Sequence, residues 1–171
     1  MRVSAFREVG GFDATLRAGE EPELCFRLRQ KGWKILRVDS EMTLHEGKIS
    51  CLSQWARRRI RAGCAAKDIF WRTGEKTYSR QIQSVRLWTV GWLGALLTAS
   101  GGALYFWGPA TALAPALAVT LALPLQMFRV ALRALRSGND WKSSLAYGVF
   151  TVLGKWPEAA GQILSRRERS R

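Results

Sequence analysis

The stretch LWTVGWLGALLTASGGALYFW, residues 87–107, decides the fold of this chain. It runs for 21 residues without a charged side chain, and about 20 apolar helical residues cross the roughly 30 Å hydrocarbon layer of a bilayer. Aromatic residues stand near both ends, where membrane helices meet water. A helix of a soluble protein rarely continues so far without a polar face. The stretch therefore predicts a membrane-spanning helix.

A second uncharged stretch, GPATALAPALAVTLALPLQMF, follows directly at residues 108–128. Gly108 and Pro109 supply a turn at the junction, so residues 87–128 are predicted to form a two-span transmembrane hairpin. Pro115 and Pro124 would weaken a helix in water, but in a membrane neighbouring helices can satisfy the backbone groups that proline leaves unbonded. We expect the prolines to kink the second span.

The distribution of basic residues predicts the orientation of the hairpin. Basic side chains flank its two outer ends and are missing from its connection; they are Arg80, Arg86, Arg129, Arg133 and Arg136. Because positive residues remain on the cytoplasmic side, both termini are expected there. This predicts a multi-pass protein of the bacterial inner (cell) membrane.

The segment after the hairpin, residues 129–171, is predicted to contain amphipathic or interfacial helices and a basic tail. RVALRALR has arginines at helical spacing and should end near Gly138. LAYGVFTVLG, residues 145–154, is too short to span a bilayer. The closing RRERSR should be attracted to anionic lipid.

The overall charge predicts an anionic partner, because 27 Lys and Arg stand against 13 Asp and Glu. Anionic membrane lipid and nucleotide diphosphates both satisfy this charge. Nucleic acid is not expected, since the basic residues lie beside the apolar spans instead of along a reading helix. The three cysteines, Cys25, Cys51 and Cys64, are widely spaced, which suits a reducing compartment and gives no zinc framework.

The amino-terminal 86 residues mix helical and extended patterns. VGGFD, residues 9–13, predicts a tight turn that delivers Phe12 to a core. Residues 20–31 have apolar positions at helical spacing, acids in the first turn, bases in the last, and Gly32 as a stop. WKILRVD, residues 33–39, predicts a short strand. A basic juxtamembrane linker is expected over residues 65–86.

The acidic cluster at the start of that helix, Glu20, Glu21 and Glu23, has two interpretations. A helix amino terminus stabilises carboxylates through its dipole. The cluster can be simple capping, with a surface pair between Glu23 and Arg27 worth about 0.3 kcal/mol. Alternatively, one carboxylate is a general base that takes a proton from a substrate hydroxyl.

Four segments in order, VGGFD, AGEEPELCFRLRQKGW, MTLHE and QWARRRIRAG, followed by apolar spans, resemble the carboxy-terminal part of family 2 glycosyltransferases. The resemblance covers most of residues 3–63. It implies an α+β fragment of a GT-A-like α/β domain over residues 1–64, followed by α-helical membrane segments, and inverting sugar transfer. In the family an acidic pair opens a helix, and its second member is the base. The resemblance therefore assigns Glu21 as the base beside Glu20, with Glu where Asp is usual.

The resemblance also implies binding residues. His45 in MTLHE stands where related enzymes can have a histidine near the metal and diphosphate, which implies Mn²⁺ or Mg²⁺; a packing or surface role is the alternative. The segment SQWARRRIRAG is similar to the QxxRW signature beside the diphosphate and acceptor sites, with Arg58 where Trp would stand. This implies a role for Gln54, Trp55, Arg57, Arg58 and Arg61, although the arginines could instead contact anionic headgroups. GKWPEAAGQ, residues 154–162, is similar to a stretch found after the membrane segments in some members.

Family members begin with a nucleotide-binding half that carries an Asp-x-Asp metal motif, and no Asp-x-Asp occurs in this sequence. We therefore expect a partial membrane-anchored enzyme that transfers sugar from a nucleotide-sugar donor to a polysaccharide, glycan or lipid-carrier hydroxyl. It should be inactive without the missing amino-terminal half, and the metal should belong to the complete enzyme. The alternative is a non-enzymatic basic membrane adaptor, which would have no need of GEEPELCFRLR and MTLHE.

Overall fold

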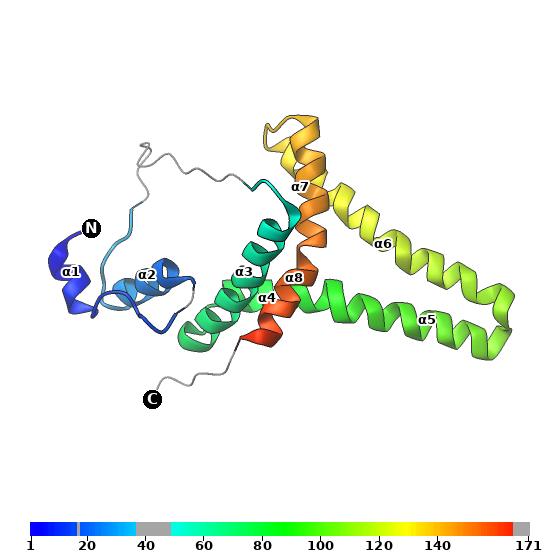
Figure 1. The fold of residues 1–171 in the computed structure, drawn as a ribbon, viewed down its shortest axis with the longest axis horizontal. Helices are drawn as coiled ribbons and strands as arrows, with labels where there is room; N and C mark the ends of the chain where they lie inside the picture. The colour runs from blue at the N-terminus through cyan, green and yellow to red at the C-terminus, as the bar shows by residue number, and fades with distance from the viewer. Residues whose placement is uncertain (17, 37–48, 166–171) are drawn as a thin grey trace. The chain divides into compact units, whose positions relative to one another are not determined.

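The structure, a computed structural model, describes residues 1–16, 18–36 and 49–165 and contains only helices within those ranges (Figure 1). Two compact units form, one from residues 1–82 with 160–171 and one from residues 83–159. In chain order the helices are α1 (Val3–Glu8), α2 (Glu20–Gln30), α3 (Leu52–Thr73), α4 (Lys76–Arg86), the π-helix η1 (Leu87–Gly91), α5 (Trp92–Trp107), α6 (Pro109–Arg136), α7 (Trp141–Leu153) and α8 (Lys155–Leu164).

The strand expected over residues 33–39 is not observed in the part that can be described. Residues 33–36 have irregular backbone, and the remainder lies outside the described ranges. A strand needs a neighbouring strand to accept and donate its backbone hydrogen bonds, and the described ranges provide none. The α/β part of the predicted fold class is therefore not confirmed, whereas the helical part is.

The core of the first unit lies between α1 and α2. Ala5, Leu24 and Leu28 are buried, and Phe6, Val9 and Trp33 pack against them. Helix α2 begins at Glu20 and is followed by Lys31 and Gly32, as the capping pattern predicts. The expectation for Phe12 was wrong: its ring is 51% exposed and only meets the edge of the Phe6 ring. The turn presents the carbonyls of Val9 and Gly11 to α2 and leaves the Phe12 ring at the surface.

Helix α3 is the central element of the first unit, and the last turns of α8 pack on it. A Cβ on Gly161 would lie 2.0 Å from the carbonyl oxygen of Ile60, so only glycine permits this approach. The Cys64 thiol donates a hydrogen bond to the carbonyl of Gly161 at 3.1 Å, and Lys67 donates to the carbonyl of Gln162 at 2.6 Å. Residues 65–86, predicted as a basic juxtamembrane linker, form the second half of α3 and α4. Their apolar residues recur at helical spacing, and Ala66, Ile69 and Ile82 are buried.

The second unit contains two helical segments that are long and apolar enough to cross a membrane, Lys76–Phe106, whose first turns belong to the first unit, and Leu113–Arg136. Helix α5 ends at Trp107, Gly108 has φ 87°, and Pro109 is the first residue of α6, so the predicted turn is confirmed. Both internal prolines lie inside α6, which continues through them. The Trp92 indole donates to the Val119 carbonyl at 2.9 Å and joins α5 to α6.

Helix α6 extends to Arg136, so the arginine-bearing segment predicted as a separate helix is its last part. The predicted stop is confirmed, with Gly138 at φ 89°. Helix α7 returns along α6 at a close crossing. A Cβ on Gly148 would lie 2.4 Å from the Met127 carbonyl oxygen and 3.0 Å from the Ala131 Cβ. The backbones of α6 and α7 touch at this glycine.

Replacing Gly148 by alanine should therefore separate α6 from α7. Overpacking of this kind costs about 1–3 kcal/mol, so the free energy of unfolding of Gly148→Ala should fall by that amount. The matched control is Gly94→Ala on α5, where an added Cβ meets no atom within 4 Å and alanine gains up to about 1 kcal/mol of helix propensity. Denaturant titration in mixed micelles, followed by circular dichroism, measures both. Equal stability of the two variants would contradict the close crossing.

Candidate functional site

Arg27 on α2 joins the glycine turn, residues 9–13, to the helix. Its guanidinium donates two hydrogen bonds to the Glu23 carboxylate, both at 2.7 Å, one to the Gly11 carbonyl at 2.7 Å and one to the Val9 carbonyl. The predicted pair between Glu23 and Arg27 is thus confirmed, but it is not a surface pair, because Glu23 is only 6% exposed. The hydrogen bonds that Arg27 donates to the Glu23 carboxylate raise the pKa of Arg27. This arginine remains charged and holds two segments together.

Asp13 makes the equivalent connection from the turn to α3. Its carboxylate accepts hydrogen bonds from the Thr15 amide at 2.9 Å and the Thr15 hydroxyl at 2.6 Å, and it pairs with Arg72. Arg72 also donates to the Thr15 hydroxyl at 2.7 Å. The Thr15 hydrogen bonds, followed by the charge of Arg72, hold the pKa of Asp13 below its ordinary value.

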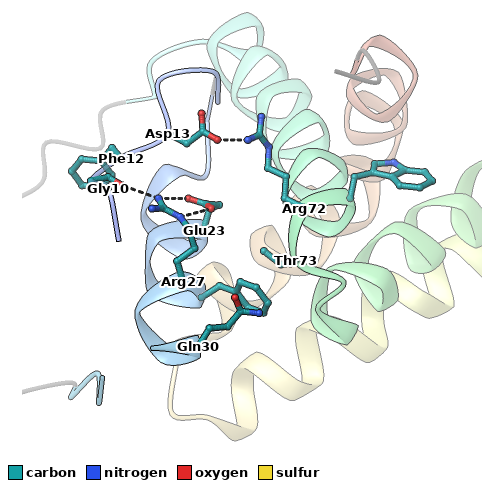
Figure 2. A pocket seen from close by; sticks show the side chains of 11 residues that line it. Gly10, Phe12, Asp13, Glu23, Arg27, Gln30, Arg72 and Thr73 are labelled. Atoms are coloured by element: carbon teal, nitrogen blue, oxygen red, sulfur yellow. Dashed lines mark hydrogen bonds and ion pairs between the residues drawn. The ribbon is translucent and has the colours of Figure 1, made fainter. Parts of the chain in front are cut away.

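These two ion pairs border an open hollow of about 530 Å³ (Figure 2). Its walls are the turn at residues 10–13, one face of α2 and the end of α3 at residues 71–73. In Figure 2 the Asp13–Arg72 pair and the Glu23–Arg27 pair lie on different walls. Glu21 does not line the hollow. At about 100° per residue it lies on nearly the opposite side of α2 from Glu23, so a base at Glu21 would act on the other face.

Glu20 and Glu21, the predicted catalytic pair, are the first two residues of α2 and are exposed. Within the described ranges neither forms an ion pair or a side-chain hydrogen bond. Every other described carboxylate has such a partner: Glu8, Asp13, Glu23, Asp68, Glu75, Asp140 and Glu158. Glu20 and Glu21 are therefore the described carboxylates whose oxygens are left without a partner in the described ranges.

Gly19 sets the position of this pair. It is the residue before α2, has φ 87°, and accepts a hydrogen bond from the Glu23 amide at 3.2 Å. A Cβ on Gly19 would lie 2.4 Å from Ile69 Cδ1 and 3.4 Å from the Ala65 Cβ. The start of α2 therefore rests directly on the second half of α3. No sequence pattern predicted a role for Gly19, Asp13 or Arg72 at this site.

The residues predicted to bind diphosphate or acceptor lie at the other end of α3. Gln54 accepts a hydrogen bond from the Ser50 amide at 3.1 Å, and Trp55 is half-buried. Arg57, Arg58 and Arg61 are exposed. They share the first turns of one helix, whereas Gly19, which precedes the carboxylate pair, lies against α3 at Ile69. The described structure does not join the two groups into one pocket.

The predicted metal ligand His45 lies outside the described residues. Within the described ranges no three His, Cys, Asp or Glu side chains are close enough to hold a metal ion. The metal remains an expectation from the resemblance.

The Lys-Trp-Pro-Glu segment at the start of α8 has a structural role in the second unit. The Trp156 ring meets the Trp92 ring edge-on at 6.2 Å, and Lys155 pairs with the buried Glu158 at 3.8 Å. Trp92 is also the residue that bonds α6. The segment thus packs against the tryptophan that joins the two hairpin helices.

Comparison with known proteins gives a family and two curated relatives. The family model described as glycosyl transferase family group 2 matches residues 1–132. The pre-mycofactocin glycosyltransferases of Mycobacterium tuberculosis strains CDC 1551 / Oshkosh and ATCC 25618 / H37Rv are each 32% identical over 106 residues. The aligned region is 62% of this chain and 19% of each relative, so it spans about a fifth of their length. No solved structure matches.

The lowered pKa of Asp13 predicts a pH dependence of stability. An aspartate with a depressed pKa in the folded state stabilises the fold above its unfolded pKa of about 3.9, and the effect is lost as pH falls through the folded pKa. Asp13→Asn should therefore lower the free energy of unfolding by about 1–2 kcal/mol at pH 7, with a smaller difference at pH 3. In an Arg72→Leu background the pH dependence of that difference should shrink. A difference that is constant with pH would contradict the assignment.

Proposed function

The chain belongs to the glycosyl transferase family 2 group, and from this we propose that it takes part in sugar transfer, with Glu21 as the base that deprotonates the acceptor hydroxyl. The donor is a nucleotide sugar, and the acceptor is a hydroxyl of a glycan, a polysaccharide or a lipid carrier. One observation carries the assignment. Glu20 and Glu21 are the only carboxylates in the described ranges without a partner there, and the resemblance to the family assigns them to its acidic pair.

The chemistry requires a carboxylate with free lone pairs on the acceptor side. A carboxylate bound bidentately by arginine, as Glu23 is by Arg27, has its oxygens occupied by those hydrogen bonds. Glu21 is exposed in the first turn of α2. We propose that Glu20 supports Glu21 and that the acceptor approaches this side of α2.

The departing nucleoside diphosphate needs positive charge nearby. We propose that the exposed Arg57, Arg58 and Arg61 supply it, with Gln54 and Trp55 bordering the same site. Guanidinium groups suit phosphate oxygens because they donate two parallel hydrogen bonds. In the complete enzyme a divalent cation, Mn²⁺ or Mg²⁺, would add electrostatic stabilisation of the diphosphate, with His45 near it. Donor binding would come from a nucleotide-binding half with Asp-x-Asp, and we expect the present chain alone to be inactive.

For the membrane we propose that α5 and α6 cross the bilayer as a hairpin with both chain ends in the cytoplasm. Their lengths and composition support this. A row of leucines on α6 is exposed to the surroundings; its members are Leu113, Leu117, Leu121 and Leu125. The arginines outside the hairpin and their absence from its connection support the orientation. The carboxylate pair would then act on the cytoplasmic side of a cell membrane.

Glu21→Gln tests the base. In the completed protein, the chain joined to a donor-binding half of a family 2 enzyme, this change should lower turnover about 10²–10⁴-fold, because the amide cannot accept the acceptor proton. Release of nucleoside diphosphate and product formation measure it in membranes. The control is Glu8→Gln, a surface acid that bonds only Trp33 within the described ranges. Undiminished turnover in Glu21→Gln would end the assignment.

Cysteine labelling tests the topology. In a variant with Cys25, Cys51 and Cys64 replaced by serine, Gly108→Cys should react with an impermeant maleimide added to intact cells, because Gly108 joins the two spans. Arg171→Cys should react only after the cells are opened. Labelling of the tail in intact cells would overturn the proposed orientation.

A further inference from the structure

We propose that Arg72 and Ile69 of α3 are positioning residues for the Glu20–Glu21 pair, and that they act through the loop from Val9 to Gly19. The inference rests on the proposed function of that pair. Neither side chain is placed in contact with substrate; each fixes where the first turn of α2 begins.

The loop has three attachments, one at each end and one in its middle. At its start, Arg27 binds the carbonyls of Val9 and Gly11. In its middle, Arg72 binds Asp13 and Thr15. The first attachment joins the loop to α2, and the second joins it to α3.

The third attachment is steric and lies next to the reacting groups. Gly19 immediately precedes Glu20, and its Cα stands so close to α3 that an added Cβ would be 2.4 Å from Ile69 Cδ1. Ile69 is 2% exposed, so surrounding atoms restrict any shift of its side chain. The φ of 87° at Gly19 also disfavours any residue with a Cβ. Both the close contact and the backbone angle therefore require glycine at this position.

The attachments matter because α2 has no side-chain cap at its amino terminus. Helix ends without such bonds fray, and a misplacement of about 1 Å can reduce a rate about a hundredfold. Helix α3, with 22 residues, is the long element to which the loop is attached. Arg72 and Ile69 lie three residues apart, so they face the loop from adjacent turns of one side of that helix.

Hydrogen exchange in the full chain, reconstituted in lipid nanodiscs, tests the attachment without any activity. Arg72→Leu and Gly19→Ala should each speed hydrogen exchange about tenfold or more at the backbone amides of residues 13–23. The exchange rates of the α3 amides should not change. Arg72→Lys should show an intermediate effect, because lysine can pair with Asp13 but lacks the fork that also reaches Thr15. The control is Lys76→Gln, which removes an exposed charge near the end of α3. Exchange at residues 13–23 equal to that of the control would overturn the proposal.

Turnover in the completed protein separates positioning from general stability. Arg72→Leu and Gly19→Ala should lower kcat about 10–100-fold with the donor KM within about twofold, and Arg72→Lys should recover part of kcat. If exchange shows a loosened loop in Arg72→Leu and Gly19→Ala but kcat is unchanged, while the separate variant Glu21→Gln is inactive, the positioning role is overturned. The base assignment then stands. Full activity of Glu21→Gln would instead remove the proposed base, and the exchange result would still report whether α3 holds the loop.

Discussion

The first unit depends on the pairing of Arg27 with Glu23. A buried charge is tolerated only when it is paired and hydrogen-bonded, and this guanidinium satisfies both carboxylate oxygens together with two carbonyls of the glycine turn. The turn has little apolar surface of its own to bury, since Phe12 is left outside. The hydrogen bonds of Arg27 to the carbonyls of Val9 and Gly11 therefore join the turn to α2.

The same contact divides the acids of α2 into two kinds. Glu23 faces Arg27 and is occupied by it, while Glu20 and Glu21, one turn or less away, face outward without partners in the described ranges. Three carboxylates in four positions would repel one another if all were buried together. The helix instead places Glu23 where Arg27 neutralises it and leaves Glu20 and Glu21 exposed in the first turn.

Local signals predicted much of this molecule. Capping residues gave the limits of α2, and the Gly108–Pro109 step gave the junction of α5 and α6, because both depend on neighbours in the chain. The position of Phe12 and the role of Arg72 could not be predicted in this way. Arg72 pairs with Asp13, which is 59 positions away in the chain. A pairing between residues so far apart produces no periodic pattern in the sequence. The strand at residues 33–39 was predicted from a local pattern. The described ranges contain no neighbouring strand to form its backbone hydrogen bonds, and residues 33–36 are irregular.

The packing of α8 on α3 has a consequence for the order of folding. Cys64 and Gly161 are 97 positions apart, yet they share a hydrogen bond within one unit. Contacts of such wide sequence separation form late, because a long loop must close first. During synthesis the ribosome releases α3 well before α8, with the apolar hairpin in between. The packing of α8 on α3 in the first unit is thus completed only when α8 emerges, after residues 87–128 have been synthesised.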